Sequence, residues 1–295
     1  MHCSGRLTAT IVTCFLVLSV VPSSFAEGFD VEIVLQGLDR PTGIAVRGNN
    51  NLFFTEIPDP GVFGSANRVV KYQLNSDKMT MLSQGEPEPI NLALAEDGSV
   101  YWACRTAGVI LEYSDGEVAP FLTGLDRPTG IASGGLDGEI YFTQVPEPGV
   151  FGGANTVERS DGFNGEILSS GEPEPTDVAV SDRGDVYWTC KAAGVILHRD
   201  ALGNREVLLD GLNAPTGIAL SPNGQQLYFT EIPTPGIPGS LGGENRVLAY
   251  DLNDGVISVV NSGDPEPTDV AVAPNGDVYW TCSTAGVIAK ATPQN

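Results

Sequence analysis

The sequence predicts an all-β protein, a six-bladed β-propeller built from three tandem two-blade repeats, with its ring closed by the N-terminal strand. Three observations predict this fold. A unit of 87 residues occurs three times, each unit divides into two related halves, and short β-branched or aromatic runs alternate with turns. The content of Gly 36 and Pro 21 in 295 residues also argues against repeats made of helices.

The repeat is visible in the letters of the sequence. The string GLDRPTGIA begins at Gly37 and again at Gly124, and GLNAPTGIA begins at Gly211, so both spacings are 87 residues (124 − 37 and 211 − 124). A related string, GEPEPTDVAV, begins at Gly171 in the second half of a unit. One proline aligns each half, namely Pro41, Pro89, Pro128, Pro175, Pro215 and Pro267. The resulting modules of about 45 residues have the length of one four-stranded blade.

Each module shows the pattern of four successive strands. After the aligning proline comes a short apolar strand, as in Ile44 to Val46, then a turn and an aromatic strand, as in Leu52 to Thr55. A third strand follows, as in Arg68 to Tyr72, and then a variable fourth, as in Glu206 to Leu209. The segment Phe29 to Leu35 resembles this fourth strand, so we expect it to complete the last blade and remove an open sheet edge.

The N-terminus has the pattern of an export signal. Arg6 precedes the apolar run Ile11 to Val21, and Ser24-Phe25-Ala26 is a small-x-small cleavage pattern. The run is too short to cross a bilayer. The sequence therefore predicts a cleaved signal peptide over residues 1–26, a single propeller domain over 27–295, no membrane span, and a secreted or periplasmic location.

Charge narrows the range of partners. Asp+Glu 37 against Lys+Arg 15 gives a formal net charge of -22, which repels phosphate backbones and excludes nucleic acid as a partner. The partners that remain are a small molecule or another protein, and we expect a monomer.

The strand motifs resemble those of the NHL-like six-bladed propellers, which include streptogramin lyases and the gluconolactonase/regucalcin family. The shared pattern is P-x-G-I-A-V, a D-G or N-G turn, L-Y-F-T-E and N-R-V, and Phe229-Thr230-Glu231 looks like the W-F-T-E strand of streptogramin lyases. The resemblance implies the fold. The lyases use histidine with a divalent cation, whereas this chain has only His2, in the predicted signal peptide, and His198, on a predicted third strand.

The resemblance to gluconolactonases does not imply a metal site in this chain. Those enzymes bind a metal just after the aligning proline. The matching positions here are Thr42, Ile90, Thr129, Thr176, Thr216 and Thr268. None of these is a strong cation ligand, so no catalytic residues can be assigned, and whether the protein is an enzyme stays open.

We name the strands of a blade A to D from the axis outward. The loops between blades (D–A) and between second and third strands (B–C) should emerge at one end of the channel. These loops are acidic and rich in proline, as in Glu172-Pro173-Glu174-Pro175 and in the longer B–C loops Ile57 to Ala66, Val145 to Ala154 and Ile232 to Glu244. Prolines lower the entropy of the free loop and favour a preformed binding rim. The alternative is that these segments only connect the blades and that their acidic side chains keep the protein soluble.

Two sets of polar residues are predicted at that channel mouth. Even blades place Asn91, Asp177 and Asp269 near the start of strand A, and odd blades place Glu56, Gln144 and Glu231 at the end of strand B. Together they could hold a divalent cation such as calcium, or a ligand rich in hydrogen-bond donors. The alternative for the first set is that each side chain caps its own loop.

Three cysteines occupy the end of strand B in the even blades: Cys104, Cys190 and Cys282. Each follows a tryptophan by two residues, so both side chains lie on one strand face. Sites repeated by threefold symmetry are too far apart for disulfides, and we expect buried structural thiols; a ring of soft-metal ligands is the alternative.

Three functions follow from these features. The first is an exported propeller that binds a ligand or partner protein through the proline-rich acidic loop face. The second is a metal-dependent lyase or hydrolase of the streptogramin-lyase or lactonase type with a divergent site. The third is a purely structural scaffold.

Overall fold

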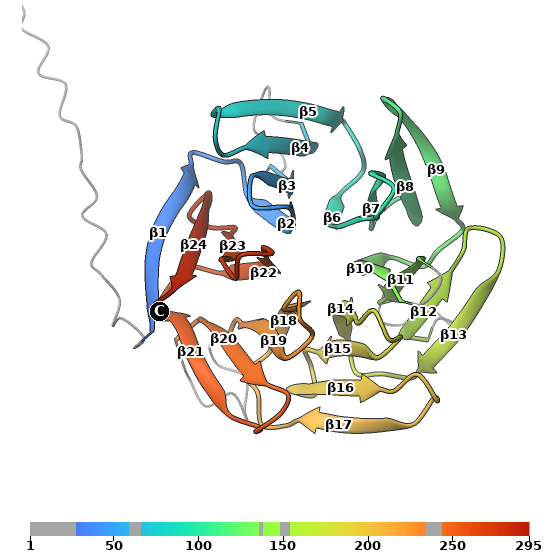
Figure 1. The fold of residues 1–295 in the computed structure, drawn as a ribbon. Coiled ribbons are helices and arrows are strands. Elements are labelled where there is room, and N and C mark those ends of the chain that lie inside the picture. The colour runs from blue at the N-terminus through green and yellow to red at the C-terminus, as the bar shows by residue number, and fades with distance from the viewer. Residues whose placement is uncertain (1–27, 59–65, 136–137, 148–153, 234–243, 295) are drawn as a thin grey trace, which may run out of the picture.

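The computed structural model describes residues 28–58, 66–135, 138–147, 154–233 and 244–294. Within them the chain forms six four-stranded antiparallel sheets around a central axis, which confirms the predicted propeller (Figure 1). The predicted signal peptide and most of the three long B–C loops lie outside the described residues. No helix that could cross a membrane is found in the described ranges.

The strands follow the predicted order from the axis outward. Blades 1 and 2 are β2 (Pro41–Arg47), β3 (Asn51–Glu56), β4 (Arg68–Gln73), β5 (Lys78–Gln84), and β6 (Pro89–Leu94), β7 (Val100–Cys104), β8 (Val109–Ser114), β9 (Glu117–Thr123). Blades 3 and 4 are β10 (Pro128–Gly134), β11 (Glu139–Gln144), β12 (Thr156–Ser160), β13 (Gly165–Ser170), and β14 (Pro175–Val180), β15 (Val186–Cys190), β16 (Val195–Arg199), β17 (Arg205–Leu209). Blades 5 and 6 are β18 (Pro215–Leu220), β19 (Gln226–Glu231), β20 (Arg246–Asp251), β21 (Ile257–Ser262), and β22 (Pro267–Val272), β23 (Val278–Cys282), β24 (Val287–Pro293) with β1 (Phe29–Gln36).

The N-terminal strand closes the ring as predicted. β1 pairs antiparallel with β24 from Phe29 opposite Pro293 to Gln36 opposite Val287, and so becomes the outer strand of blade 6. In Figure 1 the blue β1 lies alongside the red β24.

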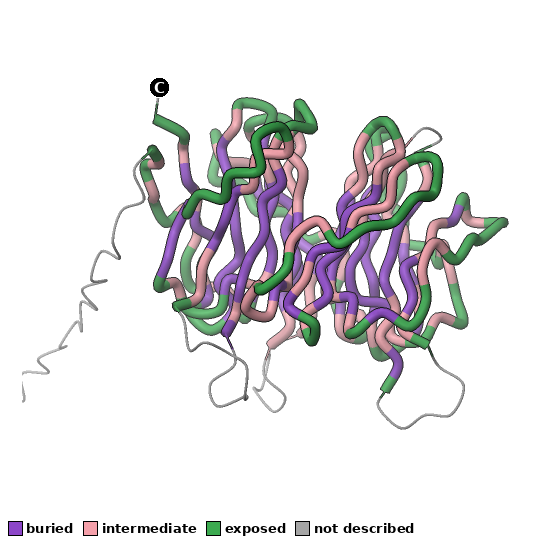
Figure 2. Tube along the Cα trace, turned by 90° about the horizontal axis from the view of Figure 1, so that it is seen from below, coloured by how far each residue is buried: buried purple, intermediate pink, exposed green. Residues whose placement is uncertain are grey.

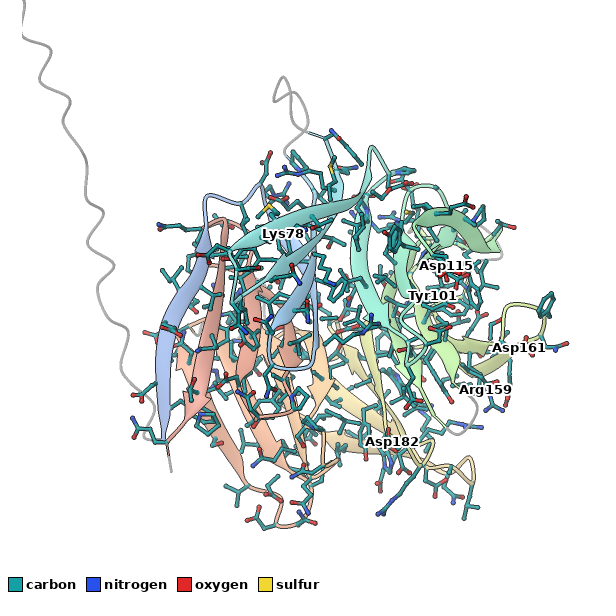
Figure 3. The ribbon with its side chains drawn as sticks, turned by 45° about the horizontal axis from the view of Figure 1, so that its top comes forward. Lys78, Tyr101, Asp115, Arg159, Asp161 and Asp182 are labelled. Atoms are coloured by element: carbon teal, nitrogen blue, oxygen red, sulfur yellow. The ribbon has the colours of Figure 1, made fainter. Side chains whose placement is uncertain are left out.

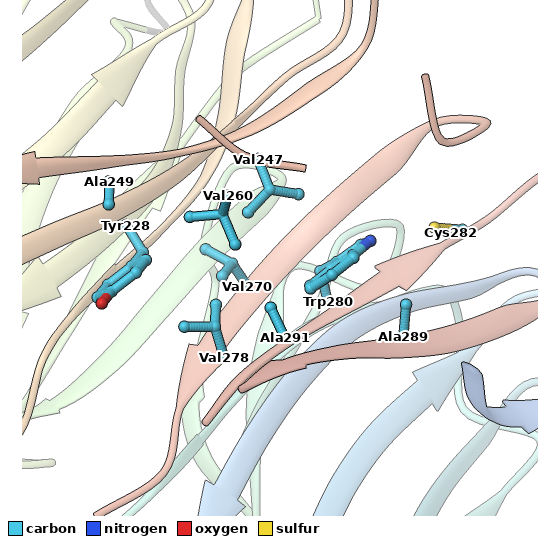
Figure 4. Packing of buried hydrophobic residues seen from close by; sticks show 10 residues of the cluster. All are labelled: Tyr228, Val247, Ala249, Val260, Val270, Val278, Trp280, Cys282, Ala289 and Ala291. Atoms are coloured by element: carbon cyan, nitrogen blue, oxygen red, sulfur yellow. The ribbon is translucent and has the colours of Figure 1, made fainter. Parts of the chain in front are cut away.

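The core lies between neighbouring blades. The second strands of the even blades, with the sequence Val-Tyr-Trp-x-Cys, are buried at every position, because both of their faces pack against neighbouring sheets. Between blades 5 and 6, for example, Trp280 packs with Val247, Val260 and Val270 (Figure 4). Burial runs along the strands, and the exposed turns gather at both ends (Figure 2).

The direction of the strands determines at which end of the channel each loop lies. Since the strands of a blade are antiparallel, the D–A and B–C loops lie at one end, which we call the D–A end. The A–B and C–D turns lie at the other, which we call the A–B end. The inner strands begin at the D–A end, so the first residues of each inner strand lie closest to it.

Candidate functional site

The third residue of each inner strand belongs to a ring of six residues around the axis. Glycine alternates there with a polar residue, and the ring consists of Gly43, Asn91, Gly130, Asp177, Gly217 and Asp269. A Cβ on Gly130 would lie 2.4 Å from Cα of Asp177, and one on Gly217 would lie 2.6 Å from Cα of Asp269. Odd blades therefore need glycine because the backbone of the next blade occupies the space of a side chain.

The two aspartates of this ring connect neighbouring blades. Oδ1 of Asp177 accepts hydrogen bonds from Val178 N at 2.8 Å and Asn91 Nδ2 at 2.9 Å. Its Oδ2 accepts a hydrogen bond from Ile218 N of blade 5 at 2.9 Å. Asp177 thus accepts hydrogen bonds from its own blade, from the following blade and from a residue across the channel.

Asp269 repeats this arrangement at the point where the ring closes. Its Oδ1 accepts from Val270 N and its Oδ2 from Ile44 N of blade 1, each at 2.8 Å. The inner edge of each strand A has no neighbouring strand, so its backbone N–H groups need other acceptors. The carboxylates supply them. The predicted alternative, in which each side chain only caps its own loop, does not account for these hydrogen bonds to the next blade.

Asp177 and Asp269 also interact with each other electrostatically, and we expect two buried carboxyl groups that interact in this way to hold one proton between them. Both are only 4% exposed. Burial raises the pKa of both carboxyl groups, and the negative charge of Asp269 raises the pKa of Asp177 further. Asn91 stands where a third aspartate would add another carboxyl group, and its amide donates a hydrogen bond to Asp177 instead.

A cavity of about 240 Å³ adjoins this polar triad on the axis. The inner strands of all six blades line it, from the triad towards the A–B end, for example at Ala45, Ala93, Ser133, Val180 and Leu220. The triad therefore stands at the D–A end of a central chamber, and the inner strands form the rest of its wall.

The triad does not fit a divalent cation. Calcium takes six to eight oxygen ligands, whereas the carboxylate oxygens of Asp177 and Asp269 already accept hydrogen bonds from backbone N–H groups and from the Asn91 amide. No cluster of three or more His, Cys, Asp or Glu side chains able to hold a metal occurs among the described residues.

The second predicted set is engaged inside its own blades. Glu56 Oε1 accepts from Asp39 N at 2.7 Å, and Glu231 Oε1 accepts from Asn213 N at 2.8 Å, so each holds the D–A loop of its blade. The other oxygen of Glu56 pairs with Arg68 at 2.7 Å. Both glutamates are completely buried.

Blade 3 replaces this ion pair by neutral groups. Gln144 Oε1 accepts from Asp126 N at 2.5 Å, which repeats the contact to the D–A loop. Its Nε2 donates to Glu158 at 2.5 Å, and Thr156 stands opposite Gln144 where blades 1 and 5 have arginine. The structure thus brings Asn91, Asp177 and Asp269 together and holds Glu56, Gln144 and Glu231 within separate blades. A ligand-binding role for either set stays a prediction.

The threonines after the aligning prolines have a structural partner. In five blades this hydroxyl lies within 2.8–2.9 Å of a threonine hydroxyl on strand B, as in Thr42 with Thr55 and Thr176 with Thr189. Blade 2 has Ile90 and Ala103 at these places. In these five blades the threonine pair therefore joins strand A to strand B by a hydrogen bond.

The cysteines are buried free thiols, as predicted. Burial raises the pKa of Cys104 and Cys190 to about 12, helped by the charges of Glu86 and Glu172 respectively. Burial also raises the pKa of Cys282. A thiol kept protonated in this way is neither a nucleophile nor a good metal ligand.

One feature of the D–A end was not predicted from the sequence. The residue before each aligning proline has a φ between 51° and 58°, in the left-handed region that glycine prefers. These six residues, which we call the mouth ring, are Arg40, Glu88, Arg127, Glu174, Ala214 and Glu266. The carbonyl of each accepts a hydrogen bond of 3.0–3.3 Å from the residue that follows strand B of its blade. The x-Pro dipeptides were visible in the sequence, but they do not specify this conformation.

The mouth ring carries both signs of charge. Glu88 pairs with Arg105, and hydrogen bonds from Arg105 and Thr106 lower its pKa although burial opposes them. A hydrogen bond from Thr284 lowers the pKa of Glu266, with smaller contributions from the charges of Arg40 and Lys191. The mouth ring therefore combines anions and cations within the predicted proline-rich acidic loop face.

Comparison with known proteins supports the fold at low sequence identity. No family model matches the chain. A curated relative from Pyricularia oryzae, named low-density lipoprotein receptor-related protein 1, is 25% identical over an alignment of 288 positions; the match covers 83% of this chain and 89% of that protein.

Solved structures of six-bladed propellers resemble this one. A gluconolactonase from Xanthomonas campestris has a TM-score of 0.70 at 15% identity and covers 93% of this chain and 99% of its own. A streptogramin B lyase has a TM-score of 0.62 at 17% identity, covering 90% and 98%. A nidogen/laminin complex has a TM-score of 0.61 at 18% identity, covering 77% and 80%. The chain therefore has the NHL-like six-bladed propeller fold that the sequence motifs indicated.

Proposed function

We propose that this chain is an exported propeller that binds a partner protein, or a ligand, through the D–A end of its channel. The observation that carries the proposal is the mouth ring. A left-handed conformation costs a non-glycine residue about 1 kcal/mol or more, yet all six positions are non-glycine and five of them carry Arg or Glu. Such strain, retained where long charged side chains surround a channel, is typical of binding sites.

The mouth ring is also held rigid before any partner arrives. Its backbone is fixed by hydrogen bonds to strand B, and Glu88 and Arg127 are oriented by ion pairs with Arg105 and Glu147. A preformed site loses little entropy on binding. Alternating charges favour a partner of complementary pattern and disfavour others. The similarity to a propeller from a nidogen/laminin complex is consistent with protein binding.

Photo-crosslinking tests this proposal. A crosslinking residue replaces Glu174 in the mouth ring and, in a control, Lys78 on the outer strand β5 (Figure 3). Each protein is exposed to extracellular fluid of the source organism. We expect a protein captured from position 174 and not from position 78.

Charge reversal then tests the captured partner. The double variant Arg40→Glu with Arg127→Glu should weaken binding of the purified partner at least tenfold, whereas Lys78→Glu should not change it. Equal binding by all three proteins, or equal capture from both positions, would contradict the proposal and favour a scaffold.

A hydrolase or lyase is the second candidate function, and one observation favours it. The Asp177–Asp269 pair lines the central chamber and holds a proton between two carboxyl groups, an arrangement that suits general acid–base chemistry. If this is the active site, activity should survive chelation and be lost in Asp269→Asn. Activity that survives this substitution would remove the pair from the reaction.

A further inference from the structure

A second concave site lies at the A–B end, away from the mouth ring. A groove of about 490 Å³ separates the A–B turns of blades 4 and 5. Blade 4 contributes Arg183, Asp185 and Tyr187, and blade 5 contributes Asn223 and Gln225 to its walls. Val180 and Leu220 line both this groove and the central chamber, so the groove adjoins the A–B end of the channel.

Direct contacts bridge the corresponding turns at other blade boundaries. Between blades 1 and 2, Arg47 donates to Gly98 O and Ala95 O, each at 2.9 Å. Between blades 2 and 3, Ser133 Oγ donates to Leu94 O at 2.7 Å. At the boundary of blades 4 and 5, Leu220 of blade 5 stands where blade 3 has Ser133, and an apolar side chain cannot donate this hydrogen bond. The groove therefore arises from a local change in side chains within a regular repeat.

The rear wall of the groove differs from the same place in blade 2. Tyr101 of blade 2 donates its hydroxyl to Glu112 at 2.9 Å. In blade 4, His198 replaces that glutamate opposite Tyr187, and the two rings stack with centroids 4.7 Å apart. Within the described residues the Tyr187 hydroxyl makes no hydrogen bond. Burial, with the charges of Asp185 and Glu206, raises its pKa to about 12, so it remains a donor at neutral pH.

The groove offers donors and acceptors side by side. Asp185 accepts a hydrogen bond from Ser181 at 3.1 Å and retains acceptor capacity. Asp182, labelled in Figure 3, and Arg183 are exposed residues of the A–B turn of blade 4. Two carboxylates against one guanidinium, in a chain of net charge -22, disfavour an anionic ligand.

We propose that this groove binds a neutral, hydroxyl-rich ligand of the saccharide type. Such a ligand presents hydroxyls that both donate and accept, together with C–H faces that can contact Val180, Leu220 and Pro222. The volume lies within the range of small-molecule sites. The proposal is independent of the D–A end.

Titration with named saccharides tests the inference. Maltotriose, cellotriose and chitotriose are titrated into the full mature protein by calorimetry and saturation-transfer NMR. We expect at least one to bind. Tyr187→Phe should weaken that binding about tenfold. Asn253 lies in an exposed turn of blade 5 that also lines the groove, so Asn253→Trp should fill the groove and abolish binding. Tyr279→Phe, the matching change in blade 6, should leave binding unchanged.

The outcomes separate the two sites. Arg40→Glu with Arg127→Glu should not affect saccharide binding, since the mouth ring lies at the other end of the channel. The inference is overturned if none of the three saccharides binds, or if binding persists in Asn253→Trp. It is also overturned if Ca²⁺ or tetramethylammonium binds the groove in their place.

Discussion

Glu231, at the end of an odd blade's second strand, and Asp177, on the axis, are both almost completely buried carboxyl groups. Glu231 accepts hydrogen bonds from the Arg246 guanidinium, with Nε at 2.9 Å, and one N–H from its D–A loop. Asp177 has N–H donors from three residues, and burial together with the charge of Asp269 raises its pKa. A cation stabilises the first carboxyl group as an anion, whereas the surroundings of the second favour its protonated form.

The difference follows from position. Strand B has a neighbouring strand C, so an arginine directly opposite can reach the carboxylate, as Arg246 does. Strand A has only the channel on its inner side, where the ring of inner strands leaves room for short side chains. A buried carboxyl group there is stabilised by backbone N–H groups and by protonation. The two sites should therefore respond differently to substitution and to pH.

The largest effect is expected when the cation is removed. Arg246→Ala leaves Glu231 buried, charged and bonded only to Asn213 N. Loss of one partner of a buried ion pair costs about 3–5 kcal/mol; because Arg246 is itself 41% exposed, we expect about 2–4 kcal/mol. Urea unfolding of the variant and the wild type measures this loss of unfolding free energy.

The matched control for this prediction is Arg159→Ala, since Arg159 pairs with Glu139 and with the exposed Glu166 at the surface (Figure 3). We expect a cost below about 1 kcal/mol for that exposed pair. Equal costs for the two substitutions would show that burial of Glu231 does not depend on its cation.

A smaller loss is expected from crowding the axis. In Gly130→Ala the new Cβ would lie 2.4 Å from Cα of Asp177, and backbone must shift. Overpacking of this kind costs about 1–3 kcal/mol. Gly165→Ala is the control, because the nearest atom to its Cβ would be 3.9 Å away. Thermal unfolding of both variants measures the difference, and a Gly130→Ala protein as stable as the control would exclude tight contact between blades 3 and 4.

The shared proton predicts the sign of a pH effect. Because burial raises the pKa of Asp177 and Asp269 above the unfolded value of about 4, the folded state retains a proton that the unfolded chain releases. Their contribution is therefore fully present below about pH 4 and is lost as the pH rises through the raised pKa, by about 1–3 kcal/mol.

Asp269→Asn separates this contribution from that of the other acids. Asparagine leaves one of the N–H groups of Ile44 and Val270 without an acceptor, which is a penalty that does not change with pH. The difference in unfolding free energy between wild type and variant should therefore shrink between pH 4.5 and pH 8. A constant difference would mean that the pair does not share a proton.

The sequence was sufficient for the fold because its signals are local and repeated. The aligning prolines, the Asn-Gly and Asp-Gly turns and the aromatic second strands each recur in phase, so blade number and ring closure followed from counting. The meeting of Asn91, Asp177 and Asp269 was also predictable, since equivalent positions of a closed repeat face the same axis.

The chemistry of those positions was not predictable in the same way. The bonds from Asp177 and Asp269 to Ile218 N and Ile44 N depend on how each blade is tilted against the next, which no local pattern specifies. The pairing of Glu56 with Arg68 did leave a signal, because the N-R-V motif recurs with Glu in blades 1 and 5 and both are absent from blade 3.

The smallest effects are expected at the cysteines, which in even blades take the place that Glu56 and Glu231 have in odd blades. A thiol needs no neutralising cation, so Cys104→Ala should cost only the small cavity left by sulfur, about 1 kcal/mol. Cys104→Ser should cost about 1–2 kcal/mol, because a hydroxyl is costlier to bury. Since burial raises the pKa of Cys104 and Cys190 to about 12, iodoacetamide at pH 8 should modify no described cysteine of the native protein and all three after unfolding in urea. Mass spectrometry counts the adducts; rapid labelling of the native state would show that the thiols are accessible and that the ends of the even second strands are not packed as the carboxylate sites are.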